Sequence, residues 1–170
     1  MSFEDLILKI ETDPNPERYY RQLEKLLASG FNPDHLVYDL NLDSLGLSIL
    51  RNNTRLFNII VKYKTRFDNI VHVPKGDSID HKDMTYLILA SYVGNVHMVE
   101  TLLNLGCGDI NLRAYRVGSA LSIAIRKRYK AIEYLLKSRG ANLDDESLIE
   151  CEEFSLISNP ELFDISDEEE

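Results

Sequence analysis

The segment TYLILA at residues 85–90 recurs 34 positions later as SALSIA at residues 119–124. Each segment opens with a hydroxyl residue and has Leu two positions on and Ala five positions on. A glycine follows 21 positions after the hydroxyl residue in both cases, at Gly106 and Gly140. A fixed period of about 20–50 residues is typical of repeat proteins. The recurrence therefore predicts two copies of one structural unit.

The residues inside this unit have helical spacing. The opening hydroxyl residue can cap a helix N-terminus through its side-chain oxygen. Leu87 and Ala90 lie three positions apart and share one helix face, where the small alanine lets a second helix approach closely. Apolar residues within 98–103 predict that second helix, and a glycine is favoured just past a helix end. The unit is predicted to be a helix, a short turn, a second helix, a glycine stop and an extended connector.

The repeated unit resembles the ankyrin-repeat family, which has a period of about 33 residues and the signature Thr-Pro-Leu-His-x-Ala. The family's Gly-Ala-Asp-x-Asn ending is similar to residues 106–111 and 140–144. The Pro and His of the signature are missing from both copies, which indicates divergent repeats of modest stability. The resemblance implies a solenoid, because one helix pair cannot bury its own apolar face and must stack on a neighbour.

Two weaker copies are predicted upstream. Residues 19–30 have the pattern of a second helix with a glycine stop, and the helix before it has apolar residues on one face, at Phe3, Leu6, Ile7 and Ile10. Residues 47–50 and 56–61 predict another helix pair, with its turn at residues 52–53.

The stretch after this second pair is longer than a minimal connector. Within it, residues 69–73 are β-prone and residues 74–77 are turn-prone. We therefore expect an extended, hairpin-like finger between the second and third repeats.

Together these patterns predict an all-α, ankyrin-type solenoid of about four helix-turn-helix repeats, the N-terminal ones degenerate, with the extended connector near 65–82. A globular α-helical bundle is the alternative, but the recurrence of the whole pattern, glycine stops included, favours the solenoid. We expect the solenoid to cover residues 1–155, with a final half-repeat at 146–151. Residues 156–170 are expected to form an acidic, disordered C-terminal tail.

Charge divides the chain into two parts. The net charge is −9, but residues 141–170 contain 12 Asp and Glu and no Lys or Arg, which leaves 16 acidic and 19 basic residues in the rest. The body is therefore slightly basic and the acidity belongs to the C-terminal end. A charge run of this kind either solubilises the chain, shields a basic patch on the body or acts as an arm that binds a basic partner.

The start of the chain lacks the basic region and long apolar region of a signal peptide. No run approaches the roughly 20 apolar residues that a membrane span needs. The two cysteines, Cys107 and Cys151, cannot form a disulfide framework and are expected to be reduced. We therefore expect a cytoplasmic or nuclear protein that is not secreted and does not enter a membrane.

The sequence contains no recognisable catalytic motif. None of the four histidines stands in a His-Glu-x-x-His arrangement, and no phosphate-binding glycine loop is present. Neither cysteine has a partner at metal-ligand spacing. The sequence therefore predicts a protein that is not an enzyme, with no catalytic residue, no metal ligand and no cofactor.

The resemblance implies that a partner protein binds to the inner-helix surface and the connector tips. In the register of the motif, these positions are His81, Lys82, Met84, Tyr92, Val93, Tyr115, Arg116, Arg126 and Lys127. Tyrosine and arginine are enriched at interaction hot spots, which makes Tyr92, Tyr115 and Arg116 the strongest candidates.

A basic cluster lies in the same part of the sequence, at Arg113, Arg116, Arg126, Lys127, Arg128 and Lys130. Direct nucleic-acid binding is nevertheless disfavoured, because nucleic-acid-binding domains are strongly basic and this body is only slightly so. The predicted function is a protein–protein interaction module, an adaptor or inhibitor, whose partner has a basic surface for the acidic tail. The alternative is a structural subunit whose partner completes the solenoid.

Overall fold

A computed structural model describes residues 2–34, 36–37, 42–64, 66–67, 70–75, 78–115 and 117–143, with only the backbone described at 36–37, 72–75 and 78–83. In this part of the chain eight helices form four consecutive pairs. The pairs are α1 (Phe3–Thr12) with α2 (Glu17–Ala28), α3 (Ser44–Leu50) with α4 (Thr54–Tyr63), α5 (Tyr86–Val93) with α6 (Val96–Asn104), and α7 (Ala120–Arg126) with α8 (Lys130–Ser138).

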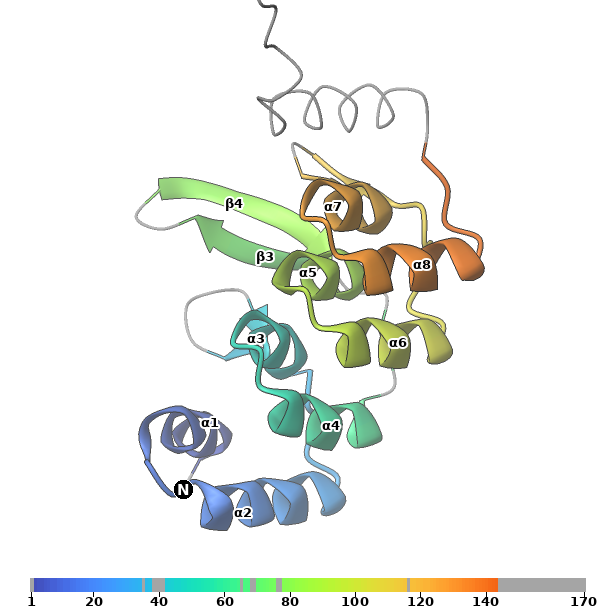
Figure 1. Cartoon of the computed structure of the whole chain (residues 1–170). Coiled ribbons are helices and arrows are strands. Elements are labelled where there is room, and N and C mark those ends of the chain that lie inside the picture. Colours follow the sequence, from blue (N-terminus) through green and yellow to red (C-terminus); the bar gives the residue numbers. More distant parts are fainter. Residues whose placement is uncertain are drawn as a thin grey trace, which may run out of the picture.

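The pairs stack in two columns. Figure 1 shows α1, α3, α5 and α7 in an inner column and α2, α4, α6 and α8 in an outer column. Within the inner column, α5 packs between α3 and α7. This arrangement confirms the predicted all-α, ankyrin-type solenoid. The proposed final half-repeat at 146–151 and the tail at 156–170 lie outside the described residues.

Short antiparallel hairpins connect successive pairs on the side of the inner column. They are β1 (Leu36–Val37) with β2 (Leu42–Asp43), β3 (Ile70–Lys75) with β4 (Ser78–Thr85), and β5 (Arg113–Ala114) with β6 (Gly118–Ser119). The β3–β4 hairpin is the longest and projects beyond the helices (Figure 1). The predicted finger is therefore confirmed, although its second strand continues to Thr85 rather than ending near residue 82.

All four inner helices begin with the same kind of side-chain cap, which at α1 is Ser2. The side chains of Asp43, Thr85 and Ser119 each accept a hydrogen bond from the backbone N–H three residues on, at 2.8, 3.3 and 3.2 Å. This bond satisfies one of the backbone donors that a helix start leaves unpaired. The predicted caps at Thr85 and Ser119 are confirmed, and Asp43 marks the equivalent start of the preceding repeat.

The core follows from the residues that come after each cap. Leu45, Leu87 and Leu121 stand two positions after the cap and are at most 2% exposed. Five positions after the cap stand Ser48, Ala90 and Ala124, which are fully buried small residues. A small side chain at this point lets neighbouring helices pack closely, which gives the solenoid one continuous apolar core.

The N-terminal pair belongs to the same core. All four apolar residues predicted to share a face of α1 are buried. The ring of Phe3 stacks on Phe31 with centroids 4.9 Å apart, and Tyr20 of α2 exchanges hydrogen bonds with Asn53 of the next repeat. The degenerate sequence of this pair therefore still supports the packing of a repeat.

In the last three repeats, the turn between the two helices contains one left-handed residue. That position is occupied by Asn52 (φ 52°), Gly94 (φ 85°) and Arg128 (φ 59°) in three successive repeats. Glycine adopts this conformation freely and asparagine tolerates it, whereas a longer side chain is strained there. The last repeat therefore carries backbone strain at Arg128.

We expect Arg128→Gly to raise the free energy of unfolding by about 0.5–1 kcal/mol, because relief of a left-handed strain of about 1–2 kcal/mol exceeds the added entropy of the unfolded chain. Chemical denaturation would measure this. Lys127→Gly is the matched control, since Lys127 has φ −85° and gains no relief. Destabilisation by both substitutions would show that Arg128 is not strained.

Candidate functional site

The predicted binding residues lie in two groups at opposite ends of the inner helices. Tyr92, Val93, Arg126 and Lys127 stand where α5 and α7 end, and Tyr115 stands in the tip between β5 and β6. The length of α7, about 10 Å for seven residues, separates the two groups.

At the helix ends, the structure brings residues of two repeats into contact. The Lys127 ammonium lies 4.0 Å from the ring centroid of Tyr92 and 6.0 Å from that of Tyr129. Tyr92 is 42% exposed, and Lys127 is also exposed. A cation over an aromatic ring is attracted to its negative face. The contact presents an aromatic surface and a positive charge side by side to solvent.

At the connector tip, Tyr115 is 80% exposed. The guanidinium of Arg126 connects the two groups, because it extends back along α7 and donates a hydrogen bond to the carbonyl of Val117. Val93 is only partly exposed and packs against the core. Arg126 and Val93 therefore support the surface more than they present side chains to a partner.

Met84 was expected to be exposed, and that expectation is wrong. Met84 is 3% exposed because it stands opposite Val71 in the hairpin register, and both side chains face the core. His81 and Lys82 belong to β4, but only their backbone is described. Arg116 lies outside the described residues.

The basic cluster is partly neutralised by neighbours. Lys130 and Lys137 both donate to Glu133, at 3.0 and 2.8 Å. The hydrogen bond from Lys137, and then that from Lys130, holds the pKa of Glu133 below its usual value. The carboxylate of Glu133 therefore offsets part of the positive charge on α8, whereas the tyrosines beside Lys127 leave its charge unchanged.

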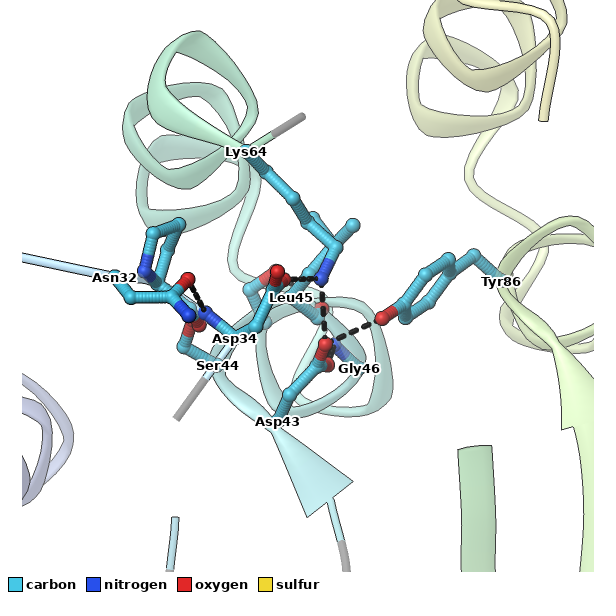
Figure 2. A network of polar contacts seen from close by, with 10 residues as sticks. Asn32, Asp34, Asp43, Ser44, Leu45, Gly46, Lys64 and Tyr86 are labelled. Carbon is cyan, nitrogen blue, oxygen red and sulfur yellow. Dashed lines mark hydrogen bonds and ion pairs between the residues drawn. The ribbon is translucent and has the colours of Figure 1, made fainter. Parts of the chain in front are cut away.

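A buried polar network was missed by the sequence analysis. Figure 2 shows it between the second and third repeats, around the fully buried side chain of Lys64. The ammonium donates to Asp34 and, at 2.8 Å, to Oδ2 of Asp43. The hydroxyl of Tyr86 donates to the same Oδ2.

The remaining groups of the network hold the two carboxylates in place. Oδ1 of Asp43 accepts the cap bond from the Gly46 N–H at 2.8 Å. The N–H of Asp34 donates to the side chain of Asn32, and the hydroxyl of Ser44 donates to the carbonyl of Pro33. Asp34 retains 27% side-chain exposure. Water can therefore reach Asp34, whereas Asp43 depends on its protein partners.

Lys64 stands at the position where the two later repeats have their glycine stop. Gly106 and Gly140 stand 21 positions after their caps at Thr85 and Ser119, and Lys64 stands at the same spacing after Asp43. Gly106 and Gly140 have positive φ, but Lys64 has φ −83° and extended backbone. The shared spacing of 21 positions was the signal in the sequence that could have identified Lys64. It shows a lysine where the later repeats have a glycine after the second helix.

The network fixes both ends of the long finger. Lys64 ends α4 just before the connector, and Tyr86 begins α5 directly after β4. Both side chains bind the carboxylate of Asp43. The root of the β3–β4 hairpin is thereby held at a defined place against α3.

The other groups that the sequence analysis considered for chemistry are metal ligands, Cys107 and His97. No three or more His, Cys, Asp or Glu side chains in that part of the chain are arranged to hold a metal ion. Cys107 is buried, and desolvation raises the pKa of its thiol to about 11, so it is a poor nucleophile at neutral pH. His97 is exposed and shares a hydrogen bond of 2.9 Å with Asn58.

We expect Lys64→Met to lower the free energy of unfolding by about 3–5 kcal/mol, because it leaves Asp43 as a buried carboxylate without its counter-ion. Lys62→Met is the control, since Lys62 forms an exposed pair with Glu24 that is worth less than about 1 kcal/mol. Denaturation of the three proteins in parallel would measure both losses.

A double variant separates charge from shape. Asp43→Asn with Lys64→Met removes the buried carboxylate and keeps an asparagine, which also caps helices well. We expect the double variant to be more stable than Lys64→Met alone. Equal stability of the two would mean that the lost packing of Lys64, and not an uncompensated charge, causes the effect.

A comparison with protein-family models gives a match. Residues 45–147 match the family model described as ankyrin repeats in three copies. Apart from the first residue of α3, this range covers the pairs α3–α4, α5–α6 and α7–α8. A search of curated proteins found no match. Among the described helices, none combines the length and the apolar composition that a membrane crossing requires.

Proposed function

This chain belongs to the ankyrin-repeat family, and from that premise we propose that it acts as an adaptor or inhibitor that occupies a partner protein without catalysis. Ankyrin repeats are generally protein–protein interaction modules and are typically non-catalytic. The observation that carries the proposal is the pair of exposed aromatic groups beside the inner helices, Tyr92 under Lys127 and Tyr115 at the neighbouring connector tip.

These residues have the properties of binding anchors. Large aromatic side chains supply contact area at a small entropic cost, and tyrosine is enriched among hot spots. Lys127 is already held over Tyr92, so less side-chain freedom is lost when a partner covers both. A partner on this surface would bury two aromatic rings and pair with one fixed cation.

The long hairpin adds a second contact region. The caps at Asp43 and Thr85 are 42 positions apart and those at Thr85 and Ser119 are 34 positions apart, so the second repeat is longer by eight residues. Insertions in repeat proteins map to loops on one face, often the binding face. With its root fixed by Lys64 and Tyr86, the hairpin is pre-positioned for a partner.

The acidic C-terminal end extends the proposal to the partner's charge. The carboxylates of residues 141–170 suit a partner with a basic surface, while the aromatic and cationic group on α5 and α7 contacts a separate part of it. A cytoplasmic or nuclear protein is the partner class that fits this proposal.

The alternative role, a subunit whose partner completes the solenoid, would need an open apolar face at the N-terminal pair. In α1 the residues of the apolar face are at most 5% exposed. The large apolar side chain of α1 that is exposed is that of Leu8, at 44%. This burial favours an adaptor or inhibitor over a subunit that is completed at its N-terminal end.

Quantitative affinity capture with variants would test the proposed surface. We expect Tyr92→Ala and Tyr115→Ala each to reduce capture of the specific partner by at least about tenfold, the effect of losing a hot-spot residue. Tyr134→Ala is the matched control, because Tyr134 is 78% exposed but lies on α8 of the outer column. Loss of the partner in the control, with retention in the other two, would place the binding surface on the outer helices.

A chain ending at Asp145 would test the acidic arm. If the arm binds a basic surface, capture falls on truncation and the affinity of the full chain decreases with added salt. Unchanged capture after truncation would eliminate the arm as a binding element and leave the proposal for the helical surface standing.

A further inference from the structure

The turn between α7 and α8 departs from the turns of the two repeats before it. Asn53 and Asn95 stand directly before α4 and α6 and accept hydrogen bonds from the N–H groups three residues on, at 3.0 and 3.1 Å. The equivalent residue before α8 is Tyr129, whose side chain makes no such bond. The residue before Tyr129 is the strained Arg128. Two residues of this turn therefore act against local stability, and natural proteins keep such departures mainly at functional sites.

The ring of Tyr129 lies instead on the turn of the preceding repeat. A Cβ atom placed on Gly94 would come within 2.7 Å of this ring, so the ring rests directly on the backbone of Gly94. Figure 1 shows the α5–α6 and α7–α8 turns one above the other on the same side of the solenoid. Tyr92 and Val96, each two positions from Gly94, are 42% and 41% exposed. The two turns thus combine aromatic and aliphatic groups in one exposed area.

Two cations in this area have no counter-ion. Lys127 and Arg128 are exposed, and no carboxylate of the described residues lies within ion-pair distance of either. Arg51 gives the contrast: it stands eight positions after its cap, as Lys127 does, and its Nε lies 3.5 Å from a carboxylate oxygen of Glu11. Lys127 has two tyrosine rings in place of that carboxylate. Since aromatic rings attract an ammonium without neutralising it, its charge remains available to an anionic group.

The unpaired positive charge beside this turn does not extend along α8. Lys130 and Lys137 both form ion pairs with Glu133, whereas α5 and α7 contain no acidic residue that would repel an anion. A nucleic acid presents a row of phosphates and is bound by an extended basic surface. Two cations beside the exposed side chains of Tyr92 and Val96 match a short peptide that carries carboxylates next to an apolar residue. Charge complementarity therefore favours an acidic peptide over a nucleic acid.

The exposed groups of the two turns form what we call the turn surface, which consists of Tyr92, Val96, Lys127, Arg128 and Tyr129. We propose that the turn surface binds an acidic peptide segment of the partner protein. Carboxylates of the segment pair with Lys127 and Arg128, and an apolar side chain beside them covers Tyr92. This inference rests on the proposed function, because it names the chemistry of the partner at one part of the binding surface. The partner then meets cations here and the acidic C-terminal end elsewhere, and two contacts of opposite charge fix its orientation.

Selection of a phage-displayed library of random short peptides on the full chain tests the chemistry of the ligand. We expect the enriched peptides to carry Asp and Glu beside an aromatic or aliphatic residue. A synthetic, fluorescently labelled copy of one enriched peptide then serves as the probe for affinity measurements by fluorescence anisotropy. Its affinity should fall as ionic strength rises, because salt screens exposed charge pairs. Enrichment of basic or uncharged peptides, or no enrichment, overturns the proposal.

Two substitutions remove the cations one at a time. Arg128→Gly and Lys127→Met should each weaken binding of the acidic peptide by about two- to fivefold, the effect of losing one exposed charge pair. Arg128→Gly separates binding from folding, because relief of the backbone strain should raise stability while the affinity falls. Lys25→Met is the matched control, since Lys25 is an exposed cation on α2. An equal loss in the control would mean that only the net charge of the chain matters, and this overturns the proposal.

The same measurements distinguish other occupants of the turn surface. Tighter binding of an oligothymidine strand than of the acidic peptide would assign the surface to nucleic acid. Peptide binding that appears only after Glu168→Gln, Glu169→Gln and Glu170→Gln would assign it to the C-terminal end of the chain itself. Either result overturns the proposal.

Failure of this inference can be told apart from failure of the proposed function. Tyr115 lies at the other end of α7 and outside the turn surface. If Tyr115→Ala loses the captured partner but the library yields no acidic peptides, the proposed function stands and only the inference about the acidic segment is overturned.

Discussion

The buried ammonium of Lys64 is the constraint on which the middle of the structure depends. A charge without water costs several kcal/mol unless ion pairs and hydrogen bonds replace its solvation. Here those partners are Asp34 and Asp43, and Asp43 is completed by the hydroxyl of Tyr86. The two aspartates lie between α2 and α3, Lys64 lies at the end of α4 and Tyr86 begins α5. A shift of any of these three segments would therefore remove a partner from a buried charge.

This directional contact differs from the apolar packing between other repeats. The stability of a solenoid is approximately a sum of repeat and neighbour terms, and apolar interfaces tolerate small sliding movements. An ion pair with a shared acceptor fixes distance and orientation together. It stands where the repeats are separated by the longest connector, and closing a longer connector costs more chain entropy. The network therefore offsets that entropic cost and fixes the position of the root of the β3–β4 hairpin.

Local signals in the sequence were enough to predict the repeats around Thr85 and Ser119, because caps, helical spacing and glycine stops depend only on near neighbours. The repeat before them was harder to recognise, since Asp43 replaces the hydroxyl cap and Lys64 replaces the glycine. The spacing between cap and stop was kept while both residue types changed. Tyr92 and Lys127 could likewise be placed from the motif, but their contact across two repeats could not.

Strand pairing is the part that sequence reasoning could not supply. Met84 directly precedes a correctly predicted cap, yet its burial is decided by Val71, 13 positions earlier in the chain and opposite it in the sheet. The same register determines which hairpin residues share a face, and one residue of slip would reverse every assignment. The eight additional residues of this repeat all enter that hairpin and lengthen it by roughly four residues a strand, about 13 Å. The repeats thus provide a regular body. What distinguishes the second repeat from the two that follow it is concentrated in one finger, whose geometry is set by non-local contacts at its root.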